Sequence, residues 1–479
     1  MHFARSLRLS VMLLLDGAAI LPAQAAPRPL DTTSVAEARA LLKALVGTNT
    51  TRDHGSTTQA ARLVADRFLQ AGWPSADVEI AGPSPTRQNL VVRWRASSPA
   101  SKPVLFMSHL DVVEAKREDW DSDPFLLREK DGYLYGRGVL DDKAAVAAWT
   151  TGLIALRRTG WRPSRDIVLL LTADEEGGDE NGVEWLLRNR RTLFDVDFVL
   201  NADAAGPELH DGKVTLFAVD VAEKSPMTIE LTVTNPGGHS SRPRSDNAIY
   251  SLAHALIRIE QYRFPVQLGD LQRAMSTRAA ETAPAAVAEA LRAIVRDAGD
   301  SAASATLARV PHLNAMLRTT CVATQLAGGH AINALPQRAT ATVNCRILPG
   351  IQPDTVIAQL RSVVADTAVH FGPPLLSKPP AAASPMRPDV LQLLARAVAA
   401  SWGKDVRVQP MLSLGATDGS FIRGLGIPVY TIWHVPLDPS DMRAHGRDER
   451  ILARSFDESV GFARDLILEA AGRSPRTLP

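Results

Sequence analysis

The chain has little cysteine, almost no net charge and no long apolar run beyond its N-terminus. It contains only 2 cysteines among 479 residues, which excludes a zinc site built from cysteine ligands. Lys plus Arg number 53 and Asp plus Glu number 52, so the formal net charge of +1 creates no field that would attract nucleic acid or an anionic membrane. We therefore expect a small-molecule partner, and no partner that is nucleic acid.

The N-terminus has the layout of a secretory signal. Arg5 and Arg8 precede an apolar stretch at residues 9–21, and a small-residue Ala-Gln-Ala sequence follows. This pattern predicts a signal peptide over residues 1–25 and export to a periplasm or the outside of the cell. An unstructured or membrane-anchoring N-terminus is the alternative. No later segment is long and apolar enough to span a bilayer, so we expect no stable membrane span after the signal is removed.

The two cysteines lie in stretches that both have strand-like patterns. Export would allow Cys321 and Cys345 to pair, because disulfides form in oxidising compartments. Buried free thiols are an equally good alternative, since unpaired cysteine packs as a small apolar residue.

The apolar pattern alternates between helical and strand-like segments. Residues 35–73 have a helical pattern. Short apolar runs, typical of strands buried in a mostly parallel sheet, occupy residues 89–94, 103–107, 166–171, 198–200, 406–411 and 428–433. The fold class predicted is α/β, with a catalytic domain whose mostly parallel sheet is flanked by helices.

A different pattern interrupts this domain. Residues 225–234 and 340–348 alternate as amphipathic strands, and residues 247–261 have a helical pattern between them. This predicts an inserted α+β lid or dimerisation domain, with the Pro- and Ala-rich residues 373–385 as the returning linker. The predicted boundaries are 26–223 for the first part of the catalytic domain, 224–385 for the inserted domain and 386–479 for the second catalytic part.

Two motifs that suit metal chemistry follow the first predicted strands. His109 ends one strand, and Asp111 can accept the second ring N–H of a zinc-bound imidazole. Gly136-Arg137-Gly138 leads into Asp141-Asp142-Lys143 at a helix start, a compact anionic cluster that suits a divalent cation. A nucleotide-binding loop is the rival interpretation, but no third glycine follows at the dinucleotide spacing and no Gly-Lys-Ser/Thr sequence occurs.

Further carboxylates follow the later strands. Asp174-Glu175-Glu176 places three acids together, which would repel one another unless some bind a cation and one holds a proton. That division suits metal-assisted acid–base catalysis. Asp203 follows another strand, and His445 lies near the C-terminus. Because ligands bind at the carboxyl ends of strands in open α/β sheets, we expect these side chains to converge.

The order of these motifs resembles the M20 family of zinc peptidases, which includes Gly-X carboxypeptidases, aminoacylases and carnosinase-like dipeptidases. The resemblance runs from about residue 42 to the C-terminus. In chain order it rests on His109-x-Asp111, the Gly136 and Asp141 motifs, Glu175-Glu176, Asp203, Gly237-Gly238-His239, Asn333, Arg346, the Gly415-Ala416-Thr417-Asp418-Gly419 loop and His445.

The resemblance implies a co-catalytic pair of zinc ions in each chain, with Co²⁺ or Mn²⁺ as alternatives. The implied ligands are Asp141 as the bridge, His109 and Asp203 at one ion, and Glu176 and His445 at the other. Glu175 would be the general base, and Asp111 would orient His109.

The resemblance also implies residues that handle the substrate. His239 would stabilise the oxyanion, and in related enzymes the equivalent histidine comes from a partner subunit, which implies a homodimer through the inserted domain. Arg346 and Asn333 would clamp a substrate carboxylate, because the planar guanidinium pairs with it bidentately. Thr417, in the last glycine-rich loop, would be a further substrate-binding residue.

The function expected first is a zinc-dependent exopeptidase of the carboxypeptidase or dipeptidase type, acting on small peptides with a free C-terminal carboxylate. An N-acyl amino acid amidohydrolase is the alternative, because it uses the same metal chemistry. A catalytically inactive metal-binding protein ranks third, since such a scaffold needs no carboxylate at the position of Glu175.

Overall fold

Residues 31–472 are described in a computed structural model, so the signal peptide predicted for residues 1–25 lies outside them. The main sheet has nine strands, in the order β1-β2-β6-β3-β7-β17-β9-β16 with β8 paired to β9. They are β1 (Val78–Ser84), β2 (Arg87–Trp94), β3 (Val104–His109), β6 (Ile167–Thr172), β7 (Phe198–Asn201), β8 (Pro207–His210), β9 (Lys213–Glu223), β16 (Arg407–Ser413) and β17 (Val429–Thr431). The neighbours β6, β3, β7 and β17 run parallel, as do β9 and β16.

All six apolar runs predicted as sheet strands lie in this sheet, and the predicted α/β class is confirmed. Both faces of the sheet are covered by helices. Successive side chains of a strand point to opposite faces, so Val104 and Phe106 pack on one face, and Leu105 and Met107 pack on the other. The first face carries α1 (Thr32–Val46), α2 (Thr57–Gln70), α3 (Lys143–Arg158), α11 (Pro388–Trp402) and α13 (Ala453–Ala471), and the second carries α4 (Gly182–Asn189) and α12 (Gly419–Arg423).

The helical pattern predicted for residues 35–73 forms two helices and not one. α1 ends at Gly47, and a loop that includes Thr48 separates it from α2. The Thr48 backbone carbonyl in this loop accepts a hydrogen bond from a side chain, whereas inside a continuous helix it would accept from the backbone. The Lys143 ammonium donates to the Thr48 carbonyl at 2.9 Å, so the break brings this loop beside the start of α3.

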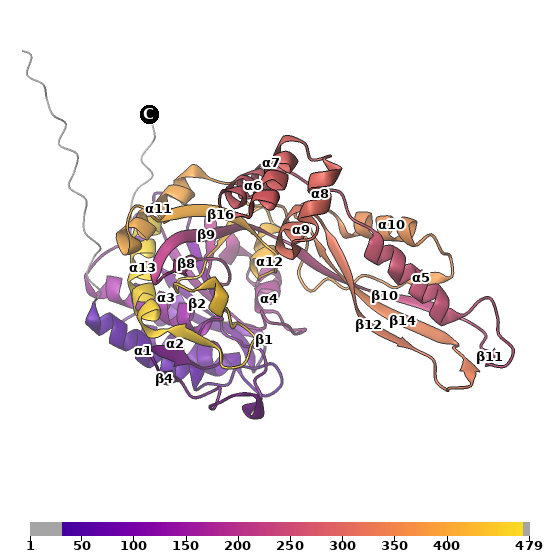
Figure 1. Ribbon diagram of the computed structural model, residues 1–479. Helices are drawn as coiled ribbons and strands as arrows, with labels where there is room; N and C mark the ends of the chain where they lie inside the picture. The colour runs from indigo at the N-terminus through magenta and orange to yellow at the C-terminus, as the bar shows by residue number, and fades with distance from the viewer. Residues whose placement is uncertain (1–30, 473–479) are drawn as a thin grey trace, which may run out of the picture.

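A second, antiparallel sheet has its own apolar core. Its strands are β12 (Thr320–Gly328), β14 (Arg338–Ile347), β10 (Ser225–Thr234) and β15 (Val369–Phe371), in that order. α5 (Ala248–Gln261) and α10 (Pro353–Val364) pack on one face. We call this sheet with its two helices the inserted lobe. It extends away from the main sheet, and the short pair β11 (Gly238–His239) and β13 (Ala334–Leu335) lies at its far tip (Figure 1).

Smaller elements complete the chain. α6 (Asp270–Thr282), α7 (Ala285–Arg296), α8 (Ser301–Leu307) and α9 (Pro311–Leu317) lie between the two sheets (Figure 1), and α6 contacts β16. A three-stranded sheet combines β4 (Arg128–Lys130), β5 (Tyr133–Tyr135) and β18 (Arg450–Leu452). Cys321 and Cys345 face each other on β12 and β14 and form a disulfide, which settles the open choice between a disulfide and free thiols.

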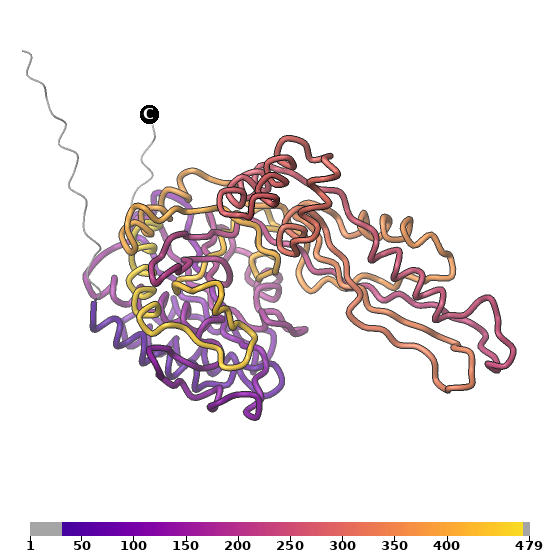
Figure 2. The backbone as a smooth tube through the Cα atoms, viewed as in Figure 1, coloured from indigo at the N-terminus to yellow at the C-terminus, as the bar shows by residue number. Residues whose placement is uncertain are grey.

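The last part of the chain returns to the main sheet. Figure 2 shows the orange and yellow segments after the inserted lobe lying against the indigo and purple N-terminal part. The returning strand β17 pairs with β7, and α13 contacts α3, so C-terminal residues lie against the first part of the chain. Among residues 31–472, no helix combines the length and apolar character needed to cross a membrane.

Candidate metal centre

The parallel strands β6, β3 and β7 end at one edge of the main sheet, and side chains that suit a metal gather there. His109 is the last residue of β3, while Glu175 and Asp203 lie just past β6 and β7. Because these strands are neighbours, their carboxyl ends bring together residues that are far apart in the sequence. The convergence expected from the sequence is present.

Two groups of ligand atoms share one residue. His109, Asp141 and Asp203 form the first group, and Asp141, Glu176 and His445 form the second; within each, the ligand atoms lie within 4.8 Å of one another. Asp141 Oδ1 is 2.8 Å from His109 Nε2, and its Oδ2 is 3.2 Å from His445 Nε2. The two oxygens of Asp141 therefore face the two groups, which is the geometry of a bridging carboxylate.

The charge of the site suits two cations. Burial, with Glu175 nearby, raises the pKa of Asp203 well above its usual range. Its Oδ2 is buried and has no hydrogen-bond partner among residues 31–472, although buried oxygens are normally satisfied. Divalent cations would satisfy this oxygen and neutralise the carboxylates, and a mixed set of imidazole and carboxylate ligands suits zinc, cobalt or manganese. The residues present therefore fit the implied pair of metal ions.

Glu449 holds the loop that carries Asp141. Its buried carboxylate accepts the Arg137 guanidinium at 2.7 Å and the backbone N–H groups of Gly138, Leu140 and Asp141 at 3.1, 2.8 and 3.2 Å. This role of Glu449 was not predicted from the sequence. In the sequence, Glu449 is seen only as an acidic residue four positions after His445. That spacing does not show whether the carboxylate is buried and hydrogen-bonded or exposed to solvent.

The Asp111 carboxylate hydrogen-bonds to the loop of Glu175 and Glu176 and not to the His109 imidazole. The nearest acceptor to His109 Nδ1 is the backbone oxygen of Asp111 at 3.0 Å, and its carboxylate oxygen is 3.7 Å away. The carboxylate accepts the backbone N–H groups of Glu175 and Glu176 at 3.1 and 2.9 Å. The residue thus orients His109 through its main chain and fixes the loop of the predicted base through its side chain.

Glu175 is buried beside the ligands, at the position expected of a general base. Burial raises its pKa to about 7, while the positive charge of Lys378 opposes that rise. Lys378 Nζ lies 2.7 Å from Glu175 Oε1. No motif in the sequence indicates this role for Lys378, although it is the one charged residue in the linker at residues 373–385.

The residues expected to handle substrate do not lie together in one chain. Arg346 is near the end of β14 closest to the main sheet, whereas His239 and Asn333 are neighbours at the far tip, where the Ser240 N–H donates to the Asn333 carbonyl at 3.0 Å. The 10 residues of β14 separate the two ends, and such a strand is about 33 Å long. Arg346 and Asn333 of the same chain therefore cannot clamp one small substrate.

Thr417 is buried, and its hydroxyl is used inside the protein. It donates to Glu223 Oε1 at 2.8 Å and accepts from Asn201 Nδ2 at 3.1 Å. Glu223 also forms an ion pair with Arg423 at 2.7 Å. Any contact of this loop with substrate would therefore come from its backbone or its neighbours, while Thr417 fixes the loop.

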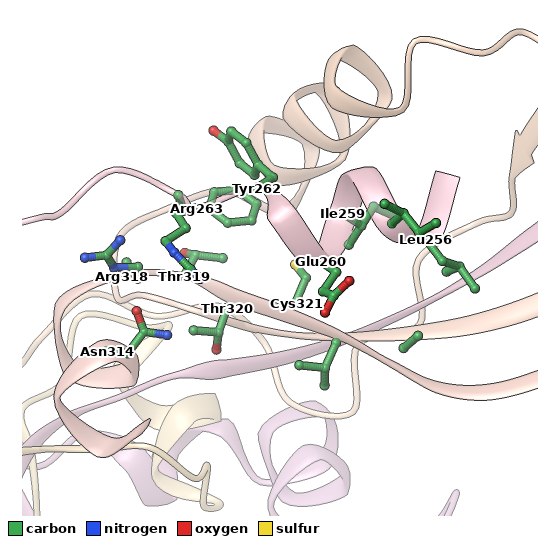
Figure 3. Close-up of a pocket in the computed structure, with 14 residues that line it drawn as sticks. Leu256, Ile259, Glu260, Tyr262, Arg263, Asn314, Arg318, Thr319, Thr320 and Cys321 are labelled. Atoms are coloured by element: carbon green, nitrogen blue, oxygen red, sulfur yellow. The ribbon is translucent and has the colours of Figure 1, made fainter. Parts of the chain in front are cut away.

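A separate cavity lies on the inserted lobe. It has a volume of about 500 Å³ and opens between α5 and β12, and none of the predicted site residues line it. Figure 3 shows apolar side chains of Leu256 and Ile259 on one side, with Arg263 and Arg318 at the other end. Val322 in its wall is 59% exposed, so the cavity belongs to an outer face of the inserted lobe and not to the metal centre.

An α/β sheet whose strand ends gather these two ligand groups around a shared carboxylate fits the class of metallohydrolases with a candidate dinuclear site. The chain belongs to peptidase family M20/M25/M40, whose model matches residues 105–469. The resemblance inferred from the motifs is confirmed, and so is the assignment of the chain as an enzyme of the metallohydrolase class.

Individual relatives cover most of the chain. It is 32% identical over 388 residues to the N-fatty-acyl-amino acid synthase/hydrolase PM20D1 of Homo sapiens, covering 78% of this chain and 76% of that protein. It is 28% identical over 413 residues to the probable carboxypeptidase S-like 2 of Dictyostelium discoideum, covering 84% and 78%. The crystal structure of the M20 family metallo-carboxypeptidase Sso-CP2 from Sulfolobus solfataricus shares the fold, with a TM-score of 0.68, 17% identity, and coverage of 90% and 98%.

Proposed function

We propose that this protein hydrolyses N-acyl amino acids to a carboxylic acid and a free amino acid. The observation that carries the proposal is the pair of ligand groups that share Asp141 beside Glu175, in a chain that is 32% identical to a relative named for N-fatty-acyl amino acids. The N-acyl amino acid hydrolase is therefore placed before the exopeptidase, whereas the expectation from the sequence placed the exopeptidase first. The comparisons favour the alternative, since the chain is 32% identical to the N-acyl enzyme and 28% identical to the carboxypeptidase S-like relative.

Zinc is the proposed metal, held by the two groups that share Asp141. When bound, a zinc pair polarises an amide carbonyl and acidifies a water molecule. The chain's own contribution is a fixed set of ligands. Glu449 anchors the backbone that carries Asp141, and Asp111 anchors the loop that carries Glu176.

Glu175 is the proposed general base. Its Oε1 is occupied by Lys378, and its Oε2 has no hydrogen-bond partner among residues 31–472, so Oε2 is the oxygen that takes the proton from the attacking water. The water oxygen bonds to the carbonyl carbon, the C–N bond breaks, and Glu175 passes the proton to the leaving amine nitrogen.

Arg346 is the proposed binding group for the substrate carboxylate. Its neighbours Cys345 and Ile347 point into the apolar core under α5, so the Arg346 side chain points to the opposite face of the sheet. Burial lowers the pKa of Arg346, and the guanidinium forms no ion pair within residues 31–472. A desolvated, unpaired guanidinium is suited to a carboxylate ligand.

A homodimer is the proposed source of the remaining groups. His239 and Asn333 lie at the tip of the inserted lobe, remote from the ligands of their own chain (Figure 1). The same lobe exposes apolar side chains on α5 and the edge strand β12: Tyr250 is 63% exposed and Leu326 is 69% exposed. An edge strand with exposed apolar residues is a pairing surface. We propose that two lobes pair there and that each places His239 at the partner's metal centre.

The proposed domain division is the one expected from the sequence, with residues 224–385 inserted between 26–223 and 386–479. Export remains a proposal for the N-terminal segment. The Cys321–Cys345 disulfide supports it, because such bonds persist in oxidising compartments.

A substrate panel tests the proposed function. We expect the purified protein to hydrolyse N-acetyl- and N-dodecanoyl-leucine with a higher kcat/KM than Ala-Leu and Gly-Leu, which present the same carboxyl-terminal residue. A carboxypeptidase is the second candidate, favoured by the similarity to the Dictyostelium relative. Faster cleavage of the dipeptides would establish it in place of the first.

Mixing two inactive variants tests the dimer. Glu175→Gln lacks the proposed base and His239→Ala lacks the group supplied in trans, so only a mixed dimer contains one complete site. Random exchange of subunits should restore about a quarter of wild-type activity, because half of the dimers are mixed and each has one working site. No recovery, in a sample that light scattering shows to be dimeric, would contradict a role for His239 across the interface.

A further inference from the structure

Lys378 joins the predicted base to a second acid. Its ammonium donates to Glu175 Oε1 at 2.7 Å, to the Glu175 carbonyl at 2.9 Å and to Asp418 Oδ1 at 3.1 Å. The three donor positions of the ammonium are therefore all used. The side chains of Lys378 and Glu175 are each 9% exposed, and that of Asp418 is 2% exposed, so these ion pairs are largely shielded from water.

Asp418 is itself held in place. Its Oδ1 also accepts the Asn181 side-chain amide at 2.7 Å, and the same amide donates to the Asp174 carbonyl at 3.1 Å. Asn181 caps α4, accepting the Glu184 N–H. Lys378 is thus attached to a fixed acid on one side, and on the other side to Glu175, whose carboxylate has no other hydrogen bond among residues 31–472.

The position of Lys378 in the chain links the base to the inserted lobe. Three residues before it, Leu375 exchanges two backbone hydrogen bonds with Thr228 on β10, at 2.9 and 2.8 Å. Six residues after it, the Ser384 N–H donates to the Val221 carbonyl on β9 at 2.7 Å. The linker is therefore attached to the inserted sheet before Lys378 and to the main sheet after it, and it touches Glu175 in between.

We propose that Lys378 is a positioning residue that fixes the orientation of the Glu175 carboxylate and makes that orientation depend on where the inserted lobe sits. The proposal rests on Glu175 acting as the general base. The ammonium occupies Oε1 and leaves Oε2 without a hydrogen-bond partner among residues 31–472. A displacement of the lobe relative to the main sheet is transmitted through the linker to Lys378, and so to the base.

Substitution of Lys378 tests this role in the metal-loaded enzyme. Lys378→Met keeps the length of the side chain and removes its charge and donors. We expect kcat to fall roughly 10- to 100-fold, because a misplacement of about 1 Å has effects of that size, while KM and the metal content stay within about twofold. Lys404→Met, an exposed position, is the matched control and should leave both constants unchanged.

A double-mutant cycle separates positioning of Glu175 from a general structural role. In a Glu175→Gln background, Lys378→Met should lower the residual rate by less than about twofold, because the residue it positions has already been disabled. An equal loss in both backgrounds would overturn the proposal. Wild-type activity of Glu175→Gln would instead refute the assignment of the base itself. Should Lys378→Met not fold, Asp418→Asn takes its place in the cycle.

Hydrogen exchange of the metal-free protein gives a readout that does not depend on turnover. Lys378→Met removes every hydrogen bond between Lys378 and Glu175, whereas Glu175→Gln removes only the charge of one of them. Both should increase deuterium uptake in peptides covering residues 375–384 relative to wild type and Lys404→Met, and Lys378→Met should do so more. Uptake unchanged in both variants would show that Lys378 does not couple the linker to Glu175.

Discussion

Glu449 offers a direct test of how the metal centre is supported. Glu449→Gln keeps the shape of the side chain but removes its negative charge and one acceptor oxygen. In the folded protein this carboxylate accepts four N–H groups, one of them from Arg137, which is only 3% exposed. The amide cannot satisfy all four donors, and the Arg137 guanidinium loses its only anionic partner among residues 31–472.

The size of the expected loss in stability follows from the burial of the Arg137–Glu449 ion pair. Removing one partner of a buried ion pair costs about 3–5 kcal/mol, because the other charge stays desolvated. The remaining Arg137 contacts, a hydrogen bond to the Gly446 carbonyl at 3.0 Å and the face of the Trp120 ring at 5.0 Å, offset only part of that. The glutamine keeps a single acceptor oxygen, so either Arg137 and Gly138 or Leu140 and Asp141 lose their acceptor. Disturbing the support of a ligand typically weakens metal affinity about 10- to 100-fold.

Two measurements on one sample check this prediction. Denaturant unfolding should give a free energy of unfolding lower by about 3 kcal/mol or more, and competition with a chelator should give metal affinity at least 10-fold weaker. Glu289→Gln, at an exposed ion pair with Arg296, is the control and should change the free energy by less than about 1 kcal/mol. Wild-type metal affinity in Glu449→Gln would refute the supporting role.

Three other outcomes are expected. Arg346→Lys should lower kcat/KM about 10- to 100-fold for substrates with a free carboxylate, because it removes a charge-assisted hydrogen bond of about 1.5–3 kcal/mol. The same substitution should leave the hydrolysis of the methyl esters of these substrates unchanged. Equal losses on the acids and the esters would contradict the role of Arg346 in binding the substrate carboxylate. Burial and the neighbouring charge of Glu223 raise the pKa of Asp220 to about 8, whereas its unfolded value is about 3.9. The folded state therefore binds the extra proton between these values, and stability falls as pH rises through 8. Asp220→Asn should flatten the stability profile between pH 5 and 9, and an unchanged profile by denaturant unfolding would exclude the raised pKa. Replacing both Cys321 and Cys345 by serine should destabilise the protein by about 3 kcal/mol, because the bond closes a loop of 24 residues, and unfolding within 1 kcal/mol of wild type would contradict this.

The sequence predicted the main sheet and the convergence at its edge, because buried parallel strands carry continuous apolar runs and their carboxyl ends meet. β3, β6 and β7 are examples, and their following residues His109, Glu175 and Asp203 lie where expected. The order of the motifs allowed the ligand set to be assembled by resemblance, although each motif alone was weak.

Contacts between distant segments were not predictable in the same way. Lys378 and Glu175 are 203 residues apart, and a periodic pattern of apolar residues does not predict which distant polar side chains meet. The break between α1 and α2 also depends on tertiary contacts, through the Lys143 ammonium at the Thr48 carbonyl. The separation of Arg346 from Asn333 follows from the length of β14, which becomes visible only once the strand pairing is known.

The measurement that tests the central claim most directly is hydrolysis of N-dodecanoyl-leucine with metal content determined on the same sample. It is made before chelation, after chelation, and after zinc is restored. The proposed dinuclear centre, with His109, Asp141, Asp203, Glu176 and His445 as candidate ligands, predicts activity with close to two metal ions per chain, loss on chelation, and recovery as zinc returns. Undiminished turnover in fully metal-free protein would contradict the account.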